Sequence, residues 1–220
     1  MKKITIAVLI FLGTFSMASA ELGVNLGVST QMGIFHATGQ ENENGEIAKD
    51  NATGVFGYSS YFIEKTLWNS GFLSRFAVGY DWVADGFNTD TSETVREDDV
   101  AAVPTKFTNT VKVNFDNLET LYGTFHITDS IYVMYGNMSV DVTTKESLAT
   151  GSKYGNTSLD GTTYGVGFDQ PIGERFFIRG EGTMMEFDGV KLTSSTNADN
   201  SVSLNDLDGA SAKLSIGVSF

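Results

Sequence analysis

Four charged residues suggest the clearest chemistry in this sequence, which is ion pairing. Arg75, Arg179 and Glu181 lie on the polar face of segments in which alternate residues are apolar. Glu64 would lie directly opposite Arg75 if the turn at Asn69-Ser70 has two residues. A lone charge in a narrow, weakly hydrated interior is costly, whereas a bidentate arginine–carboxylate pair satisfies both partners. We therefore expect Glu64, Arg75, Arg179 and Glu181 to form the centre of a structural charge network. The polar faces also carry Asp81, Asp169 and Lys213.

Catalytic and metal-centred chemistry finds little support. His36 and His126 fall in different segments without a recognisable Ser or Asp partner, so we expect no catalytic triad. The chain has no cysteine, which excludes thiol catalysis, cysteine-ligated zinc and iron–sulfur clusters. The adjacent Asp98 and Asp99 lie in a predicted loop and are expected to be solvated. We therefore expect a protein that is not an enzyme and that needs no cofactor or metal.

The balance of charge also excludes a class of partner. There are 14 Lys and Arg against 27 Asp and Glu among 220 residues. No stretch gathers basic residues into a patch, so the protein is not expected to bind nucleic acid.

The first 20 residues have the pattern of a secretory signal peptide. Lys2 and Lys3 precede the apolar run from Ile4 to Leu12, which leads to the small residues Ala18-Ser19-Ala20. The run is too short to span a membrane comfortably. We expect cleavage after Ala20 and a single domain from residue 21 to residue 220.

Alternation with a period of two predicts eight strands in that domain. In the first strand Val24, Leu26 and Val28 share one face, and Gly23, Asn25 and Gly27 share the other. The facing of the strand at 131–144 stays open, because apolar residues occur on both parities. The predicted strands cover about 22–34, 54–66, 72–82, 107–127, 131–144, 161–169, 175–181 and 209–220.

The connections alternate between short and long. Tight turns are expected near Trp68–Gly71, Thr128–Ser130 and Gln170–Glu174, and long polar loops at 39–53, 84–105, 145–157 and 193–208. An even strand number with this asymmetry is the layout of a bacterial outer-membrane barrel. Because lipid offers backbone groups no partner, such a sheet must close. The predicted fold is therefore all-β, a closed eight-stranded antiparallel up-and-down transmembrane barrel. A soluble calyx would instead require the large residues to face inward.

Aromatic residues and the carboxyl terminus agree with this fold. Trp68 and Phe72 at the first turn, and Tyr80 and Trp82 at the other end of the third strand, suit the two membrane interfaces. Phe220, preceded at steps of two by Val218, Ile216 and Leu214, resembles the terminal signature recognised by the barrel assembly machinery. The arrangement resembles the small eight-stranded barrels of the opacity-protein type and the OmpA transmembrane domain. The resemblance implies a monomer in outer-membrane lipid, with the assembly machinery as a partner through Phe220. No periplasmic domain after Phe220 is expected.

The function expected from these features lies in the four predicted loops. The four predicted loops carry a net charge of −10, and they would face the outside of a Gram-negative cell. We expect an envelope-structural role or a surface interaction through these acidic loops, with a surface ligand that the sequence does not name. The alternative is a narrow, porin-like channel for ions or small solutes, in which the same lumenal charges would select the permeant. A further hypothesis is that the acidic rim binds calcium.

Overall fold

A computed structural model describes residues 23–220 except 69, 89–91, 99–104 and 148–150. The predicted signal peptide, residues 1–20, lies outside the described residues. No helix among the described residues is long and apolar enough to cross a membrane. The elements are β1 (Val24–Glu43), β2 (Glu46–Thr66), the 3₁₀ helix η1 (Phe72–Arg75), β3 (Phe76–Trp82), β4 (Phe87–Asn88), β5 (Ser92–Asp98), β6 (Thr105–His126), β7 (Ile131–Ser147), β8 (Thr157–Ile172), β9 (Phe176–Phe187), β10 (Val190–Thr193) and β11 (Ser201–Ser219).

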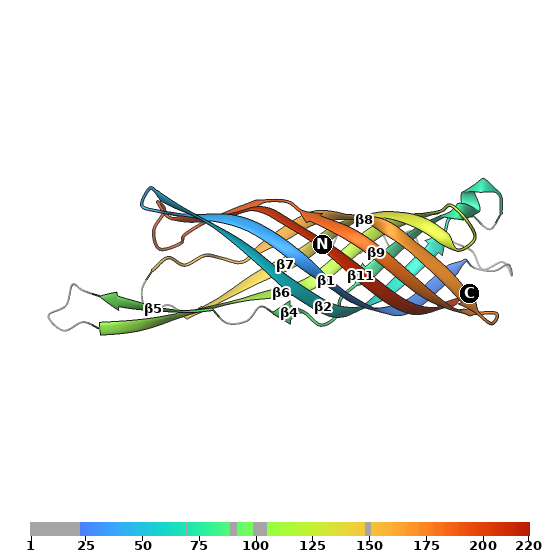
Figure 1. The fold of residues 1–220 in the computed structure, drawn as a ribbon, viewed down its shortest axis with the longest axis horizontal. Helices are drawn as coiled ribbons and strands as arrows, with labels where there is room; N and C mark the ends of the chain where they lie inside the picture. The colour runs from blue at the N-terminus through green and yellow to red at the C-terminus, as the bar shows by residue number, and fades with distance from the viewer. Residues whose placement is uncertain (1–22, 69, 89–91, 99–104, 148–150) are drawn as a thin grey trace.

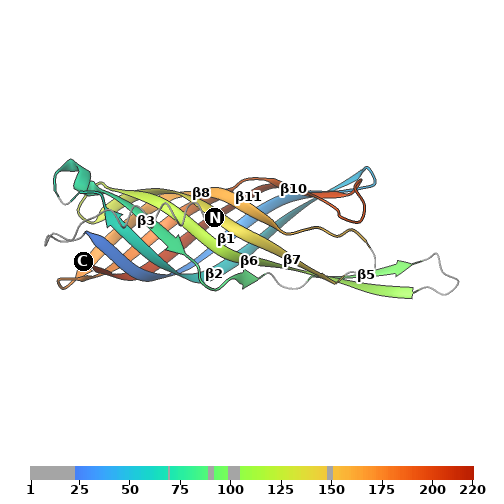
Figure 2. The same ribbon diagram turned by 180° about the vertical axis from the view of Figure 1, so that it is seen from behind.

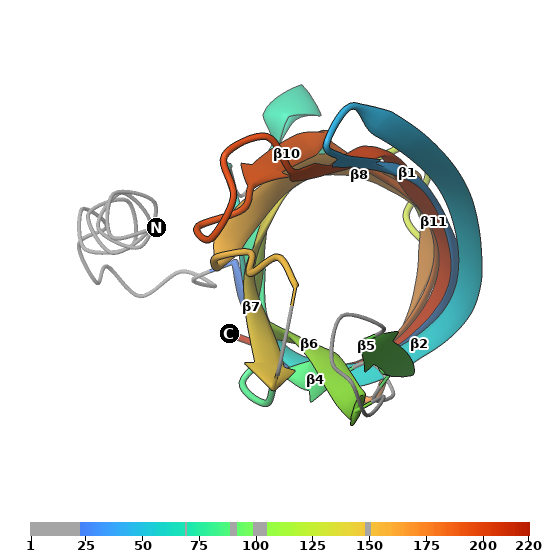
Figure 3. The same ribbon diagram turned by 90° about the vertical axis from the view of Figure 1, so that its left-hand side faces the viewer.

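Eight of the described strands close into one antiparallel ring. Their order is β1-β2-β3-β6-β7-β8-β9-β11, and β11 pairs back with β1 (Figures 1 and 3). At the short-turn end the closure continues as the amide of Val24 donates to the carbonyl of Phe220 at 3.2 Å, and the amide of Phe220 donates back at 2.9 Å. The remaining strands are extensions, since β4 and β5 pair with β6 and β10 pairs with β11. The predicted eight-stranded closed barrel is confirmed.

The bulky apolar side chains that were predicted to face lipid point away from the lumen. Val28, Val166 and Leu214 are exposed on the outer wall, while their strand neighbours turn inward. An apolar outer surface on a closed sheet suits hydrocarbon, where every backbone group is already paired within the ring.

The strand whose facing the sequence left open obeys the same rule. On β7, Ile131, Val133 and Tyr135 face outward, and Tyr132 and Met134 are buried in the lumen. The inward row is itself apolar because it packs against the other lumenal side chains. That is why alternation of polarity could not assign this strand.

Photolabelling from the lipid would test the facing of β8 directly, because a photogenerated carbene inserts into C–H bonds and needs no ionised side chain. Val166 is 60% exposed on the outer wall and Thr163 is 4% exposed in the lumen. We expect a diazirine probe dissolved in the liposome bilayer to label Val166 and to spare Thr163, with the labelled residues mapped by mass spectrometry. The reverse pattern would mean that the bulky face points inward, as in a soluble calyx.

The first short connection differs from the expected tight turn. Residues Phe72–Arg75, which were predicted to begin a strand, form η1, and β3 begins only at Phe76. Gly71 adopts a positive φ of 76°, and the hydroxyl of Ser74 donates to its carbonyl oxygen at 2.7 Å. The connection closes where the amide of Leu67 donates to the carbonyl of Phe76 at 2.9 Å. The local turn geometry thus overrides the alternation of Phe72 through Arg75.

Two of the predicted long loops are largely strand. Residues 39–53 form the ends of β1 and β2, which meet in a tight hairpin at Asn44-Gly45, both with positive φ. Residues 201–208 likewise belong to β11. Strand pairing uses backbone groups, so the ladder can continue into water with polar side chains on both faces. Asn-Gly is a strong signal for a two-residue hairpin turn and could have indicated this from the sequence. Figures 1 and 2 show the strands projecting well past the barrel at this end.

Candidate functional site

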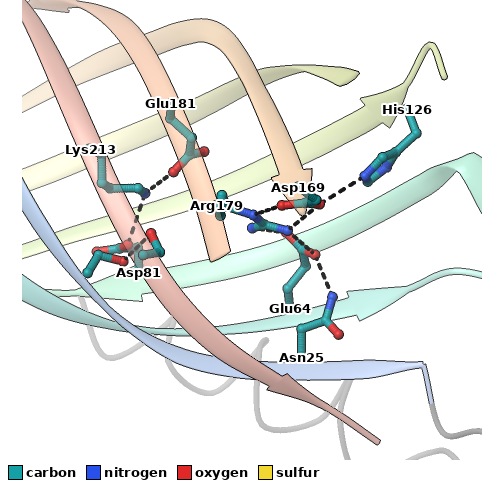
Figure 4. Close-up of polar contacts among 10 residues, drawn as sticks. Asn25, Glu64, Asp81, His126, Asp169, Arg179, Glu181 and Lys213 are labelled. Atoms are coloured by element: carbon teal, nitrogen blue, oxygen red, sulfur yellow. Dashed lines mark hydrogen bonds and ion pairs between the residues drawn. The ribbon is translucent and has the colours of Figure 1, made fainter. Parts of the chain in front are cut away.

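The buried guanidinium of Arg179 on β9 is the centre of the lumen's charged layer (Figure 4). It contacts the carboxylate of Glu64 on β2 through two nitrogens, with N–O distances of 2.9 and 3.0 Å. It also contacts the carboxylate of Asp169 on β8 at 2.7 and 3.2 Å. Arg179 and Glu64 are 2% and 1% exposed. Two bidentate contacts in so dry a place are the strong form of this interaction.

Strand register positions these groups. Asp169 and Arg179 are direct cross-strand partners on β8 and β9, and Asn25 and Glu64 are partners on β1 and β2. The side-chain amide of Asn25 donates to Glu64 at 3.0 Å, and the imidazole Nε2 of His126 lies 3.2 Å from Asp169. The sequence interpretation missed Asn25 and His126 as members. The register across the β1–β2 hairpin could have identified Asn25 once its turn was placed.

Three aromatic rings surround the guanidinium. The Cζ atom of Arg179 lies 5.1 Å from the ring centre of Tyr132 and 5.4 Å from those of Phe62 and Phe177. Such contacts between a cation and ring faces add attraction where water is excluded. The rings therefore fill the lumen around the charges as well as stabilising them.

Each of these rings lies over a glycine in the paired position of the next strand. A fourth ring, Tyr122, is arranged in the same way. Tyr122 on β6 pairs with Gly136 on β7, and its ring covers Gly79 on β3, on the other side. A Cβ atom added at any of these four glycines would overlap the facing ring. The pairs are Gly27 with Phe62, Gly79 with Tyr122, Gly167 with Tyr132 and Gly217 with Phe177.

A second charged group lies next to the first along the lumen. The ammonium of Lys213 is 2.9 Å from Glu181 and 3.3 Å from Asp81 (Figure 4). Glu181 and Lys213 are cross-strand partners on β9 and β11. Glu181 thus pairs with Lys213, although the sequence interpretation grouped it with Arg179.

The expected pair between Glu64 and Arg75 is wrong. Glu64 lies opposite Gly79, because η1 lengthens the first connection and shifts the register. Arg75 is exposed at the short-turn end, where its guanidinium donates to the carbonyl oxygen of Ile127 at 3.0 Å. Of the four predicted residues, the structure brings Glu64 and Arg179 together, places Glu181 in the neighbouring group and leaves Arg75 outside the lumen.

Little free space remains beside the second group. A cavity of about 20 Å³ lies on its loop side, lined in part by Asp81, Tyr122 and Lys213. A water molecule needs at least about 10–15 Å³ measured in this way. The cavity therefore has room for about one water molecule.

The histidines have ordinary polar contacts. His36 lies 3.2 Å from the hydroxyl of Thr53 on the exposed part of the wall, and His126 contacts Asp169. Among the residues with described side chains, no group of three His, Asp or Glu could hold a metal ion. Asp98 and Asp99, expected to be solvated, have no described side chains.

Three of the long connections touch one another at their tips. The amide of Asn44 donates to the side chain of Asn200, whose own amide group donates to the hydroxyl of Ser152, at 2.9 and 2.8 Å. The backbone amide of Ser195 donates to the carbonyl of Lys153 at 2.8 Å. These contacts order part of the loop end into one surface, which we call the loop-tip cluster.

No known family model matches the sequence, and no curated protein matches it. Solved structures with a similar arrangement include OprG from Pseudomonas aeruginosa, with 15% identity over 91% of this chain and 97% of that one, at a TM-score of 0.48. The outer membrane protease OmpT from Escherichia coli has 8% identity over 94% and 99%, at 0.47. The attachment invasion locus protein Ail of Yersinia pestis has 15% identity over 88% and 99%, at 0.38.

These likenesses are limited to the coarse architecture. The closed ring and the apolar outer wall of this chain are those of an outer-membrane β-barrel in contact with lipid.

Proposed function

We propose that the protein is a monomeric, non-conducting outer-membrane barrel whose function lies at its loop end. One observation carries this proposal, namely the double carboxylate clamp on Arg179 across the lumen, from β2 on one side to β8 and β9 on the other. Such a clamp is expensive to open, because it would leave charges unpaired in a dry interior. It supports a structural network made of Glu64, Arg179 and Asp169 with Glu181 and Lys213 beside it.

The loop end is the remaining surface for a role outside the cell. It extends far beyond the ring, it is acidic in sequence, and the loop-tip cluster orders part of it. An envelope-structural or surface-interaction role uses this surface without any passage through the barrel. The competing role as a narrow channel would require solute to pass both charged groups and the 20 Å³ space between the walls.

Planar bilayer recording separates the two roles. We expect the purified protein, folded in detergent, to give no stable conductance steps at neutral pH, because the clamp closes the lumen. Arg75→Ala serves as a matched control, since Arg75 lies outside the lumen and its loss should leave the bilayer equally silent. Stable steps in the natural protein that change in Arg179→Ala would show that the charges line an ion path.

A further inference from the structure

The inward faces change character along the barrel. On β9 the inward residues run from Arg179 and Glu181 through Thr183 to Met185 and Phe187. The lumen is therefore charged toward the short turns and apolar toward the loops. A buried apolar cluster of Val83, Leu118, Val140 and Leu159 lies in this loop-side half.

A cavity of about 570 Å³ lies beside that cluster. Its lining is mainly aromatic and aliphatic, and includes Phe35, Phe56, Phe115, Leu118, Met185 and Leu207. The volume lies within the range of about 300–1,000 Å³ that is usual for small-molecule sites. In the described structure, side chains fill the half of the lumen near the short turns, but they leave this space in the loop-side half open.

Among the described residues, the strand ladder next to the cavity is interrupted. The ladder between β2 and β3 ends at the pair Tyr61–Trp82, whereas β2 continues on to Glu46. The described strands β4 and β5, which follow β3 in the chain, pair with β6 rather than with β2. Figures 1 and 2 show the β1–β2 hairpin and the β5–β6 arm leaving the barrel as separate projections. The cavity is lined by both sides of this interruption, by Gly54–Tyr58 of β2 and by Phe115 and Leu118 of β6.

We propose that this cavity binds one uncharged, hydrocarbon-like small molecule, which enters through the interruption between β2 and β4. The lining favours such a ligand, because Asp208 on β11 is the single carboxylate among the described lining residues and is itself exposed. A charged or strongly polar ligand would lose hydration without gaining partners.

The position of the entrance favours a free molecule over the tail of a membrane lipid. The rings of Tyr61 and Trp82, 5.8 Å apart and exposed on the outer wall, lie at the end of the ladder. Exposed aromatic pairs of this kind mark the membrane interface. The entrance begins on the loop side of this pair, and a lipid tail runs from the headgroup in the opposite direction.

Photolabelling in liposomes of phosphatidylethanolamine and phosphatidylglycerol tests the site. The probe is an uncharged alkyl diazirine, and labelled residues are mapped by mass spectrometry. We expect label on the inward residues Phe56, Leu118 and Met185 that excess dodecane displaces. Outward residues such as Val28 and Leu214 should also be labelled, but without displacement, since bulk lipid reaches them. Label restricted to outward residues would overturn the proposal. Equal labelling of the cavity by phosphatidylcholine with a diazirine in its acyl chain would also overturn it, in favour of a lipid tail.

A pair of neighbouring substitutions adds a matched control. Met185→Trp should fill the cavity and lower the displaceable label about tenfold or more, a loss of at least about 1.4 kcal/mol in binding. Met184→Trp adds the same ring to the outer wall and should leave the displaceable label in the cavity unchanged. Heat-modifiable gel mobility checks that both variants fold, and the map of the natural protein tests the site even if Met185→Trp does not. An undiminished cavity label in folded Met185→Trp would count against the site.

This proposal depends on the closed lumen for the floor of the cavity. The failure of one proposal can be told apart from the failure of the other. Conductance steps would refute the closed lumen, whereas the label map tests the ligand site.

Discussion

Replacing Arg179 with methionine is expected to lower the free energy of unfolding by about 3–5 kcal/mol. The substitution keeps the approximate length of the side chain but removes the cation that Glu64 and Asp169 share. Both carboxylates would then lose the cation they share, and only the side-chain amide of Asn25 and the imidazole of His126 would still contact them. The loss of the three ring contacts adds to the cost. Urea titration of the barrel in lipid vesicles, followed by tryptophan fluorescence, measures the change.

Arg75→Met is the matched control for this experiment. Arg75 is exposed, and its single hydrogen bond to the carbonyl of Ile127 can be replaced by water. We expect a change within about 0.5 kcal/mol. If Arg179→Met were as mild as Arg75→Met, the charged layer would not stabilise the barrel and its role would have to be sought in function.

The charged layer shows what the sequence could and could not predict. Alternation assigned Arg179, Asp169, Glu181 and Lys213 to the lumen, because each strand has one wet or lumenal face. Which carboxylate meets which cation depends on register across different hairpins, and register depends on turn geometry. The 3₁₀ helix at Phe72–Arg75 places Arg75 outside the layer. The alternation of apolar and polar residues in this segment does not predict that helix.

The prediction that the long connections are loops was wrong for a different reason. Their polar composition resembles that of loops. Polar composition indicates that side chains are exposed to water, but it does not indicate whether the backbone is paired as a strand. The hairpin that ends at Asn44-Gly45 continues the ladder of β1 and β2 above the apolar wall, where both faces can be polar. The apolar interior of the loop-side half was also missed, since Phe56 and Tyr58 lie on a face that is polar farther along the same strand, at Ser60 and Glu64.

Adding one methyl group at Gly167 should destabilise the barrel by about 1–3 kcal/mol. The new Cβ atom in Gly167→Ala would overlap the ring of Tyr132, which is fully buried. That ring lies 5.1 Å from the imidazole of His126 and an equal distance from the guanidinium carbon of Arg179, so it cannot move without disturbing the charged layer. The same urea titration measures the loss.

Gly182→Ala on the adjoining strand isolates the effect of the ring. An added Cβ there meets nothing within 4 Å, and the residue faces outward. Removing a flexible glycine should then stabilise the barrel by about 0.4–1 kcal/mol. A double variant with Tyr132→Leu should recover part of the cost of Gly167→Ala, because residues in contact are not additive. If Gly167→Ala were harmless, or if its cost persisted unchanged in the double variant, the ring of Tyr132 would not be what requires glycine at this position.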